Sequence, residues 1–327
     1  MKKVLKNSRV LVTGGAGFIG SNLVESLLNE GNYVVCLDNF STGKRENLKS
    51  FSDNPSFRLI EGDIRNYSDC EKAVEGMDIV FHEAALGSVP RSIKDPVTST
   101  DVNIGGFVKM LYAAGQAGVK RFIYAASSST YGDHPDLPKK EDKIGKPLSP
   151  YAITKYVDEL FAENFSGIYN IEVIGLRYFN VFGRRQDPFG AYAAVIPLFV
   201  KKLLTHEAPV INGDGSVSRD FTYIDNVIQA NHLSAIAGNR NAVNQVYNVA
   251  HGERTSLNEL FNIIRGIISE TDPEVSETEP VYGPVRAGDI PHSLASIDKA
   301  KRLLGYEPSF NVKSGLKEAI KWYRENL

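Results

Sequence analysis

The chain has 327 residues, of which 42% are hydrophobic and 23% are charged, and this composition is typical of a globular protein of about two domains. Lys and Arg number 37 against 39 Asp and Glu, so the net charge of −2 argues against a nucleic-acid binder or a membrane-surface binder. We see no signal-peptide pattern and no apolar run of about 20 residues. The two cysteines, Cys36 and Cys70, indicate a reduced compartment, and we expect a cytoplasmic protein.

Short β-branched strands alternate with amphipathic helices through the first half of the chain. This alternation is typical of a parallel sheet that is covered by helices on both faces. The predicted strands are residues 9–13, 33–38, 57–61, 79–83, 121–126 and 172–176. The predicted helices between them are residues 18–28, 68–74, 97–115 and 151–165. The pattern predicts an α/β protein with a Rossmann-type, doubly wound parallel sheet.

The pattern of predicted elements changes in the second half of the chain, where loops with glycine and proline separate shorter helices and strands. Helices are predicted at residues 194–204, 224–237, 257–268 and 312–325. Loops of this kind often lie over a site that a rigid scaffold supports. We expect a first domain over residues 1–177. Residues 178–327 are expected to form mainly a smaller C-terminal α/β lobe that binds substrate, with the chain crossing back to the first domain.

A glycine-rich loop follows the first predicted strand directly. Residues 13–20 read Thr-Gly-Gly-Ala-Gly-Phe-Ile-Gly, which places Gly14, Gly17 and Gly20 between a strand and a helix. In dinucleotide-binding loops the first glycine permits a tight turn, the second lets the backbone approach a pyrophosphate, and the third lets the helix pack on the sheet. The helix N-terminus adds free N–H groups. The loop predicts a dinucleotide site, and an ordinary turn with spare glycines is the alternative.

Asp38 ends the second predicted strand. A carboxylate at this place can accept hydrogen bonds from both ribose hydroxyls and repels a 2′-phosphate, which favours NAD over NADP. Alternatively, Asp38 caps the turn that follows. Asp63, Ala84 and Ala85 follow the third and fourth strands, at the edge where open sheets bind ligands, so we expect them near the adenine and ribose.

Tyr151 and Lys155 begin a predicted helix directly after Pro150 and lie one turn apart on the same face. An ammonium group at that spacing stabilises a phenolate and converts an inert phenol into a base. The fifth strand ends in the hydroxyl-rich run 127–130, which can orient a substrate hydroxyl toward the phenolate. The alternatives are an ordinary surface helix and a solvated turn.

These motifs together resemble the extended short-chain dehydrogenase/reductase superfamily over essentially the whole chain. Within it, the sequence is similar to the nucleotide-sugar 4-epimerases, most of all to the bacterial UDP-N-acetylglucosamine 4-epimerases, an N-acetyl-preferring group. The segments that carry the resemblance are TGGAGFIG (13–20), GSVPRS (87–92), SSSTYG (127–132), YAITK (151–155), LRYFNVFG (176–183), RRQDP (184–188), NGDG (212–215), RDF (219–221) and RAGD (286–289).

The resemblance implies a catalytic group made of Ser127, Tyr151 and Lys155. It implies NAD as the cofactor, contacted by Gly14, Gly17, Phe18, Ile19, Gly20, Asp38, Asn39, Ser41, Gly43, Asp63, Ile64, Ala84, Ala85, Tyr151, Lys155 and Tyr178. It implies a UDP-sugar contacted by Gly87, Ser88, Ser127, Ser128, Ser129, Asn180, Gln186, Val195, Asn212, Arg219, Arg286, Asp289 and Ser293.

Charge and size at a few of these positions bear on the substrate. Arg219 and Arg286 are expected to neutralise the diphosphate, because planar guanidinium groups suit phosphate oxygens, although each alone is typical of a solvated charge. Asp225 matches a position that orders the substrate lobe. Ser293 stands where similar enzymes restricted to glucose and galactose have a tyrosine, so an N-acetyl group is expected to fit. Alternatively, Ser293 is an ordinary loop residue.

The reaction that the resemblance implies is the reversible inversion at C4 of a UDP-N-acetylhexosamine (UDP-GlcNAc to UDP-GalNAc) through a 4-keto sugar, with UDP-Glc and UDP-Gal as further candidates. Sugar-nucleotide dehydratases carry an Asp-Glu pair after the catalytic hydroxyl; here Ser128 and Ser129 stand there, which disfavours elimination. An epimerase of UDP-N-acetylhexosaminuronic acid and a non-catalytic NAD-binding regulatory module are the alternatives.

Other chemistries have weak sequence support. His82-Glu83-Ala84-Ala85-Leu86 begins like a zinc-protease motif but ends in Leu86, and no metal site is expected. In similar proteins, helices matching residues 97–115 and 151–165 build a homodimer through a four-helix bundle. A homodimer is therefore expected here, although the apolar positions of these helices can also be satisfied within one subunit.

Overall fold

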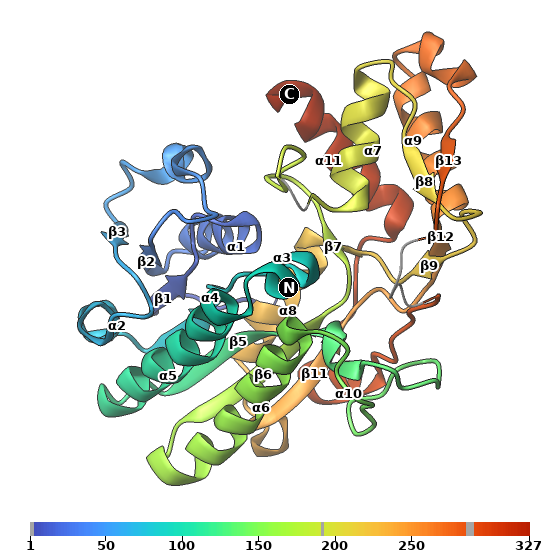
Figure 1. The fold of residues 1–327 in the computed structure, drawn as a ribbon. Helices are drawn as coiled ribbons and strands as arrows, with labels where there is room; N and C mark the ends of the chain where they lie inside the picture. Colours follow the sequence, from blue (N-terminus) through green and yellow to red (C-terminus); the bar gives the residue numbers. More distant parts are fainter. Residues whose placement is uncertain (1–2, 191–192, 286–290) are drawn as a thin grey trace.

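The computed structural model describes residues 3–190, 193–285 and 291–327. Within them, a 7-stranded parallel sheet has the order β11-β6-β5-β4-β1-β2-β3 (Figure 1). Its strands are β1 (Arg9–Thr13), β2 (Tyr33–Asp38), β3 (Phe57–Glu61), β4 (Ile79–His82), β5 (Arg121–Ser127), β6 (Glu172–Tyr178) and β11 (Gln245–Val249). The strand order reverses at β1, as in other Rossmann-type sheets, so the predicted fold class is confirmed.

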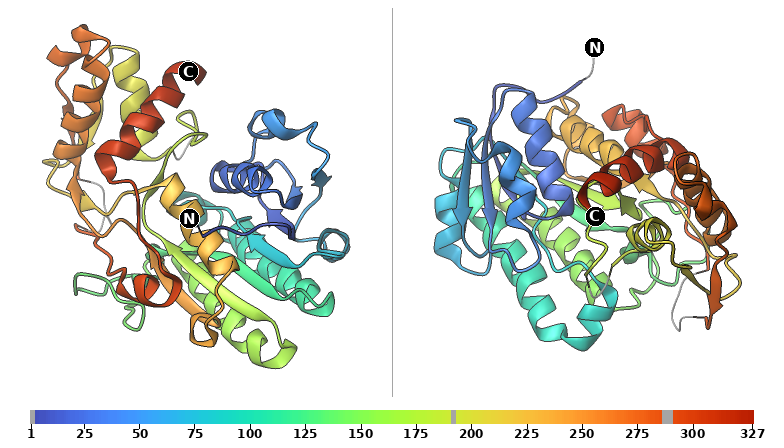
Figure 2. Two further views of the ribbon diagram at one scale, coloured as in Figure 1. Left: turned by 180° about the vertical axis from the view of Figure 1, so that it is seen from behind. Right: turned by 90° about the horizontal axis from the view of Figure 1, so that it is seen from above.

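Both faces of the sheet are covered by helices. Because successive side chains of a strand point to opposite faces, each strand contributes to the core on both sides. In β1, Val10 and Val12 belong to one hydrophobic cluster and Leu11 to the other. The first cluster includes side chains of α1 (Phe18–Asn29) and α8 (Ile224–Ala235). The second includes side chains of α2 (Tyr67–Val74), α5 (Phe107–Gln116) and α6 (Pro150–Tyr169). Figures 1 and 2 show these helix groups on opposite sides of the sheet.

The C-terminal part of the chain adds helices and short strand pairs beside the sheet. The helices are α7 (Val195–Leu204), α9 (Leu257–Ser269), α10 (Asp298–Leu304) and α11 (Val312–Asn326). The pairs are β7 (Val181–Phe182) with β10 (Thr222–Tyr223), β8 (Val210–Asn212) with β13 (Val281–Gly283), and β9 (Ser218–Arg219) with β12 (Thr255–Ser256). We call residues 179–225 and 250–285 of this part the upper lobe; Figures 1 and 2 show it at the opposite end of the molecule from α2 and β3.

The predicted helix over 97–115 is interrupted. The structure has α4 (Pro96–Thr100), a π-helical turn at Asp101–Gly106 and then α5. Gly106 packs on Ile64 so closely that a Cβ atom would lie 2.5 Å from Ile64 Cδ1. The side chain of Asn103 accepts a hydrogen bond from the backbone N–H of Leu86 at 2.8 Å. Turns of this kind are frequent at functional sites.

Several short elements were not predicted from the sequence. They include β11, the short strands β7 to β10, β12 and β13, the helices α3 (Val89–Lys94) and α10, and the 3-10 helices at Arg45–Phe51, Ser128–Tyr131, Arg240–Ala242 and Pro273–Glu277. β11 pairs with β6, with Gln245 opposite Ile174 and Val249 opposite Tyr178. Its polar residues hide the continuous apolar run that usually identifies a buried strand. In the described part of the chain, no helix is long and apolar enough to cross a membrane.

Candidate active site

A cavity of about 310 Å³ lies where β1, β2, β3 and β4 end. This is the edge at which open parallel sheets bind ligands, next to the reversal of strand order. Most of the residues expected to contact NAD line it: Gly14, Gly17, Phe18, Ile19, Gly20, Asp38, Asn39, Ser41, Asp63, Ile64, Ala84 and Ala85. Gly87, expected at the sugar, also lines this cavity.

The glycine loop has no room for side chains. Gly14 has a φ of +67°, and a Cβ atom there would lie 2.8 Å from the Ala84 backbone. A Cβ atom on Gly20 would lie 2.2 Å from the Gly14 carbonyl oxygen. Gly17 is the N-cap of α1 and provides no side-chain cap, so the first N–H groups of the helix are available to an anion.

Asp38 caps the turn after β2, which was the alternative left open by the sequence, and its carboxyl group also lines the cavity. Its Oδ2 accepts a hydrogen bond from the Ala16 N–H at 2.9 Å, and its Oδ1 accepts one from the Phe40 N–H at 2.8 Å. It therefore fixes the glycine loop and the turn after β2 while it also lines the cavity. Each carboxylate oxygen has further lone pairs that can accept hydrogen bonds from ribose hydroxyls. Burial raises the pKa of Asp38.

Two other carboxyl groups line this cavity and differ in their surroundings. Asp63 accepts hydrogen bonds from Arg65 and Asn39, and the Arg65 side chain holds the pKa of Asp63 down at about 2. Burial instead raises the pKa of Glu83 to about 7. Glu83 Oε1 accepts a hydrogen bond from the Tyr178 hydroxyl at 2.8 Å, whereas Oε2 has no partner among the described residues. Tyr178 therefore does not line the cavity itself but is hydrogen-bonded to Glu83, which does.

The start of α6 is fixed by hydroxyl groups on both sides of Tyr151. Ser149 caps the helix by accepting a hydrogen bond from the Ala152 N–H at 3.1 Å, and Pro150 occupies its first turn. Ser92, on α3, accepts a hydrogen bond from the Tyr151 N–H at 3.0 Å. These contacts place Tyr151 in the first turn of the helix, four residues before Lys155.

Lys155 is almost fully buried, with 2% of its surface exposed. Its Nζ donates to the Ala125 carbonyl of β5 at 2.9 Å and to Asp158 Oδ2 at 3.2 Å. Burial by itself lowers the pKa of Lys155, but Asp158 and Tyr151 outweigh it and raise the pKa. The ammonium group is therefore retained near neutral pH, as stabilisation of a phenolate requires.

Ser127 is the last residue of β5 and lies beside the start of α6. Its Oγ accepts hydrogen bonds from the Ser129 N–H at 3.1 Å and from the Ser129 hydroxyl at 2.9 Å. Ser128 and Ser129 form the following 3-10 turn with Thr130 and Tyr131. Only hydroxyl groups accompany Ser127 in this turn, with no carboxyl group to act as a strong acid or base.

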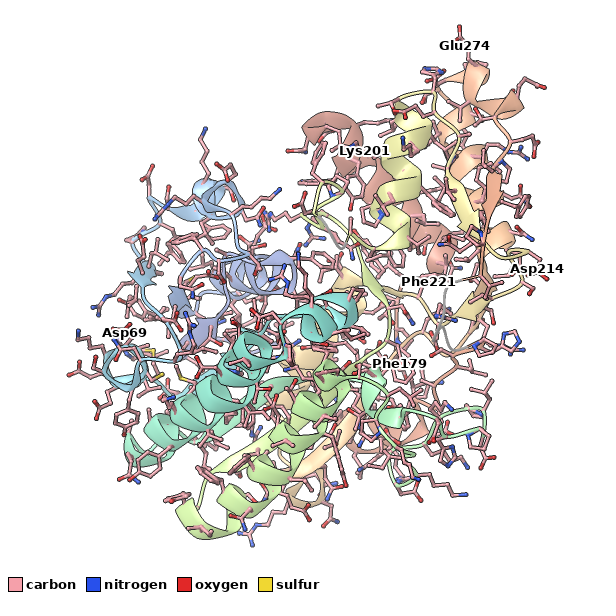
Figure 3. The ribbon with its side chains drawn as sticks, viewed as in Figure 1. Asp69, Phe179, Lys201, Asp214, Phe221 and Glu274 are labelled. Carbon is pink, nitrogen blue, oxygen red and sulfur yellow. The ribbon has the colours of Figure 1, made fainter. Side chains whose placement is uncertain are left out.

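A second cavity, of about 510 Å³, lies in the upper lobe. Five of the residues expected at the UDP-sugar line it: Asn180, Gln186, Val195, Asn212 and Arg219. Phe221 also lines it, and Figure 3 shows this residue beneath α7. Val195 begins α7, which has no side-chain cap, so its first N–H groups are available to a phosphate.

Polar contacts within the upper lobe hold this second cavity in shape. Asn180 Nδ2 donates to the Asp220 carbonyl at 3.1 Å. Gln186 Nε2 donates to the Val181 carbonyl at 3.0 Å, and its buried Oε1 has no partner among the described residues. Asp225 pairs with Arg184 at 2.7 Å, next to the Gln186 loop.

The other expected residues that the structure describes lie outside the linings of the two cavities: Gly43, Ser88, Ser127, Ser128, Ser129, Tyr151, Lys155, Tyr178 and Ser293. Ser88 caps α3, and a Cβ atom on Gly43 would lie 3.0 Å from Asp38 Oδ1. The N–H of Ser293 donates to the Ser218 carbonyl at 3.1 Å, beside Arg219. Arg286 and Asp289 lie outside the described residues.

The structure also identifies residues that sequence reasoning missed. Glu83, Asn103, Ser92 and Asp158 lie within the site or support it directly. Asn103 also donates to the hydroxyl of Thr154 at 3.1 Å, so it joins the π-helical turn to α6. A polar residue within an apolar helical pattern is the one sequence signal that could have pointed to Asn103 and Asp158, and only the structure shows that both are buried.

The fold and the site together define an extended short-chain dehydrogenase/reductase: a glycine loop after β1, an acidic end to β2, and a Tyr–Lys pair on α6. The model of the NAD dependent epimerase/dehydratase family matches residues 10–250. The chain belongs to this family and is an enzyme, which sets aside the non-catalytic regulatory module.

Solved structures of similar proteins agree with this assignment. A UDP-N-acetylglucosamine 4-epimerase from Methanobrevibacter ruminantium, in complex with UDP-N-acetylmuramic acid, is 40% identical, with 99% of this chain and 100% of that chain covered and a TM-score of 0.92. A UDP-glucose 4-epimerase from Thermotoga maritima with UDP-glucose is 37% identical (97% and 99% covered, TM-score 0.89). A UDP-glucuronic acid 4-epimerase from Bacillus cereus with UDP-glucuronic acid and NAD is 31% identical (98% and 100% covered, TM-score 0.87).

NAD is the cofactor of this family, and the first cavity fits it. The close-packed glycines leave the N-terminus of α1 open to a pyrophosphate, and Asp38 lies at the end of β2. The lining has the Asp38 carboxyl group at the end of β2, which disfavours the 2′-phosphate of NADP.

Proposed function

We propose that this enzyme inverts C4 of a UDP-linked N-acetylhexosamine reversibly, interconverting UDP-GlcNAc and UDP-GalNAc, and that it also accepts UDP-Glc and UDP-Gal. The observation that carries the proposal is the arrangement of Ser127 and the Tyr151–Lys155 pair, with Ser128 and Ser129 where a dehydratase has carboxyl groups. The similarity to 4-epimerases over nearly the whole chain supports the same reaction class.

The residues of the chain supply proton transfer and orientation. When bound, NAD supplies the oxidation and the return reduction at the sugar C4. The Tyr151 phenolate, stabilised by Lys155, removes the proton from the 4-hydroxyl directly or through Ser127, and it returns the proton after C4 has changed configuration. The hydroxyl of Ser127 orients the oxygen at C4. The 4-keto sugar turns over about its diphosphate linkage, so the uracil and the phosphates are held firmly and the sugar loosely.

The second cavity is the proposed place for the nucleotide part of the substrate. Arg219 and the N-terminus of α7 offer positive charge and N–H groups to the diphosphate. Asn180, Gln186 and Asn212 add amide groups, of which the free Oε1 of Gln186 can accept a hydrogen bond.

Ser293 is the proposed determinant of the N-acetyl preference. Its backbone is tied to Ser218, next to Arg219, and a small side chain leaves volume for a substituent at C2. Ser293→Tyr should therefore suppress turnover of UDP-GlcNAc and spare or improve turnover of UDP-Glc. One extra or missing small group in a pocket changes discrimination by about 10–200-fold. Equal responses of the two substrates would contradict the volume argument.

The test of the proposed function is substrate conversion followed by NMR. The purified protein is incubated separately with UDP-GlcNAc, UDP-Glc and the uronic acid UDP-GlcNAcA, with and without added NAD, and the anomeric and H4 signals of the 4-epimers are followed. Conversion of UDP-GlcNAc at the highest rate is the expected result. Conversion of the uronic acid alone would instead favour the alternative substrate class, to which the Bacillus cereus relative gives some support. No conversion of any sugar would refute the proposal.

We also propose a homodimer formed through a four-helix bundle, to which each subunit contributes α6 and the helical residues 97–115 (α4, the π-helical turn and α5). Exposed apolar side chains gather on these neighbouring helices: Val97 at 78% exposure, Ile153 at 50% and Leu160 at 48%. Large exposed apolar patches mark interaction sites, and α4 and α6 contact each other. Sedimentation should show a dimer, and Leu160→Glu should give a monomer. Leu327→Glu, an exposed leucine at the C-terminus, is the matched control, and a monomeric unmodified protein would refute the dimer.

A further inference from the structure

A buried carboxyl group that the proposed mechanism does not use lies beside the catalytic lysine. Asp158 follows Lys155 by three residues on α6, and its Oδ2 accepts a hydrogen bond from Lys155 Nζ at 3.2 Å. Asp158 has no exposed surface, and its Oδ1 has no hydrogen-bond partner among the described residues. Burying an ion pair in this way costs free energy of desolvation, and removing only one partner leaves an uncompensated charge.

Lys155 therefore lies between two groups on its own helix, and its ammonium group attracts negative charge on both of them. Tyr151 precedes it by one turn, and Asp158 follows it by slightly less than one turn. A negative charge that is already close to Lys155 weakens the attraction that the ammonium group exerts on a phenolate. We infer that Asp158 is a positioning residue that holds the ammonium group of Lys155 and limits how strongly it favours the ionised form of Tyr151.

Other charged and titratable groups face this pair from each neighbouring strand. They are His82 on β4 and Glu83 after it, Tyr124 on β5, Arg177 on β6, and Glu159 on α6 itself. Burial lowers the pKa of His82 to about 3, so this ring is neutral near neutral pH. Arg177 forms its own buried pair with Glu159 at 2.7 Å. Burial raises the pKa of Asp158, and Lys155 opposes the rise.

Glu83 is the other carboxyl group within electrostatic reach of Lys155, but its position differs from that of Asp158. It lines the first cavity and is held by Tyr178. No hydrogen bond joins Glu83 to Lys155 among the described residues, whereas Asp158 has a direct one. Asp158 is accordingly the carboxyl group with the larger expected influence on the ammonium group.

The inference rests on the proposed roles of Tyr151 and Lys155 but not on the identity of the sugar. The test is an ultraviolet titration of the NAD-loaded protein, in which the absorbance of ionised phenol is followed against pH. Subtraction of the same titration of Tyr151→Phe isolates Tyr151. Asp158→Asn keeps the size of the side chain and removes its charge. We expect it to move the midpoint of Tyr151 ionisation down by up to about one pH unit. The shift is at the lower end of the one to three units that a charge within about 4–6 Å produces, because Asp158 lies seven residues from Tyr151 on α6 and acts through Lys155.

The matched control is Glu163→Gln, which removes a carboxylate from an exposed position on the same helix. It should leave the midpoint where it is. The acid limb of the pH profile of kcat should move in parallel with the midpoint in Asp158→Asn, which a purely structural role would not cause. Asp158→Ser, which also removes the charge, is the second variant if Asp158→Asn fails to fold.

The outcomes separate this inference from the proposed function. If the unmodified protein shows no transition that depends on Tyr151, both proposals are overturned. If the transition is present and Asp158→Asn leaves it in place or moves it up, the role of Asp158 alone is overturned. Equal downward shifts in Asp158→Asn and Glu163→Gln also overturn it, since they show an effect of total helix charge.

Discussion

Tyr151→Phe should reduce 4-epimerase turnover by about 10²–10⁴-fold while the protein stays folded, because a general base contributes an effect of this size and the substitution removes only one hydroxyl group. The hydrogen bond from the Tyr151 N–H to Ser92 uses the backbone, so α6 keeps its start. The measurement is the initial rate of UDP-GlcNAc conversion at saturating substrate, together with a thermal unfolding curve.

Tyr156→Phe provides the matched control on the same helix. Tyr156 directly follows Lys155 in sequence and lines a separate cleft that contains Glu141, Glu159 and Arg177. Removing the hydroxyl group of Tyr156 should leave turnover within a few-fold of that of the unmodified enzyme. Activity of Tyr151→Phe within about tenfold of the unmodified rate would remove Tyr151 from the role of base.

Gly20→Ala should disrupt the cofactor site and the stability of the fold together. The added Cβ atom would lie 2.2 Å from the Gly14 carbonyl oxygen and 2.8 Å from the Gly15 Cα atom. Because both contacts are with backbone, the loop must move. Overpacking of this kind costs about 1–3 kcal/mol in the free energy of unfolding. Denaturant unfolding and fluorescence titration with NADH should show lower stability and weaker binding of the dinucleotide.

Gly167→Ala is the control for the helical preference of alanine. Gly167 lies on the exposed side of α6, and no atom lies within 4 Å of the position its Cβ would take. Alanine should leave the stability unchanged or raise it by up to about 1 kcal/mol, since alanine favours helix over glycine. Unchanged unfolding and NADH binding in Gly20→Ala would show that the loop can relax and that its close packing is not required.

The parts of the fold that were predicted from the sequence are those with strong local signals. β1 and β2 are buried on both faces and are nearly continuous apolar runs, and the glycine loop stands between β1 and α1. β11 has no such signal, because it contains Gln245 and Asn248 and becomes a strand through its pairing with β6. The π-helical turn before α5 likewise depends on the contact of Gly106 with Ile64, which lies far away in sequence.

The residues of the candidate site also fall into two groups, those that the sequence predicted and those that only the structure shows. The residues expected to bind the cofactor directly follow the ends of β1, β2, β3 and β4. The glycine loop and the strand pattern therefore predict most of the lining of the first cavity. The roles of Glu83 and Asp158 come from burial and from an oxygen without a partner, and neither property is visible in a sequence. Ser92 contributes through the Tyr151 N–H, a contact across 59 residues that no local pattern encodes.

The pairing of β11 with β6 limits how relatives of this enzyme can be recombined. The chain leaves the sheet after β6, builds α7 and α8, and returns to supply the outermost strand. One hydrophobic cluster therefore includes Ile174 of β6, Ile196 of α7 and Tyr247 of β11. In a fragment that stops at residue 177, β6 would lack its pairing with β11 and become an exposed edge strand, and such strands promote aggregation. A chimaera that exchanges substrate preference should therefore keep β6 and β11 from one parent and graft both the segment between them and the segment after β11 that contains Ser293, instead of joining two halves at a single point.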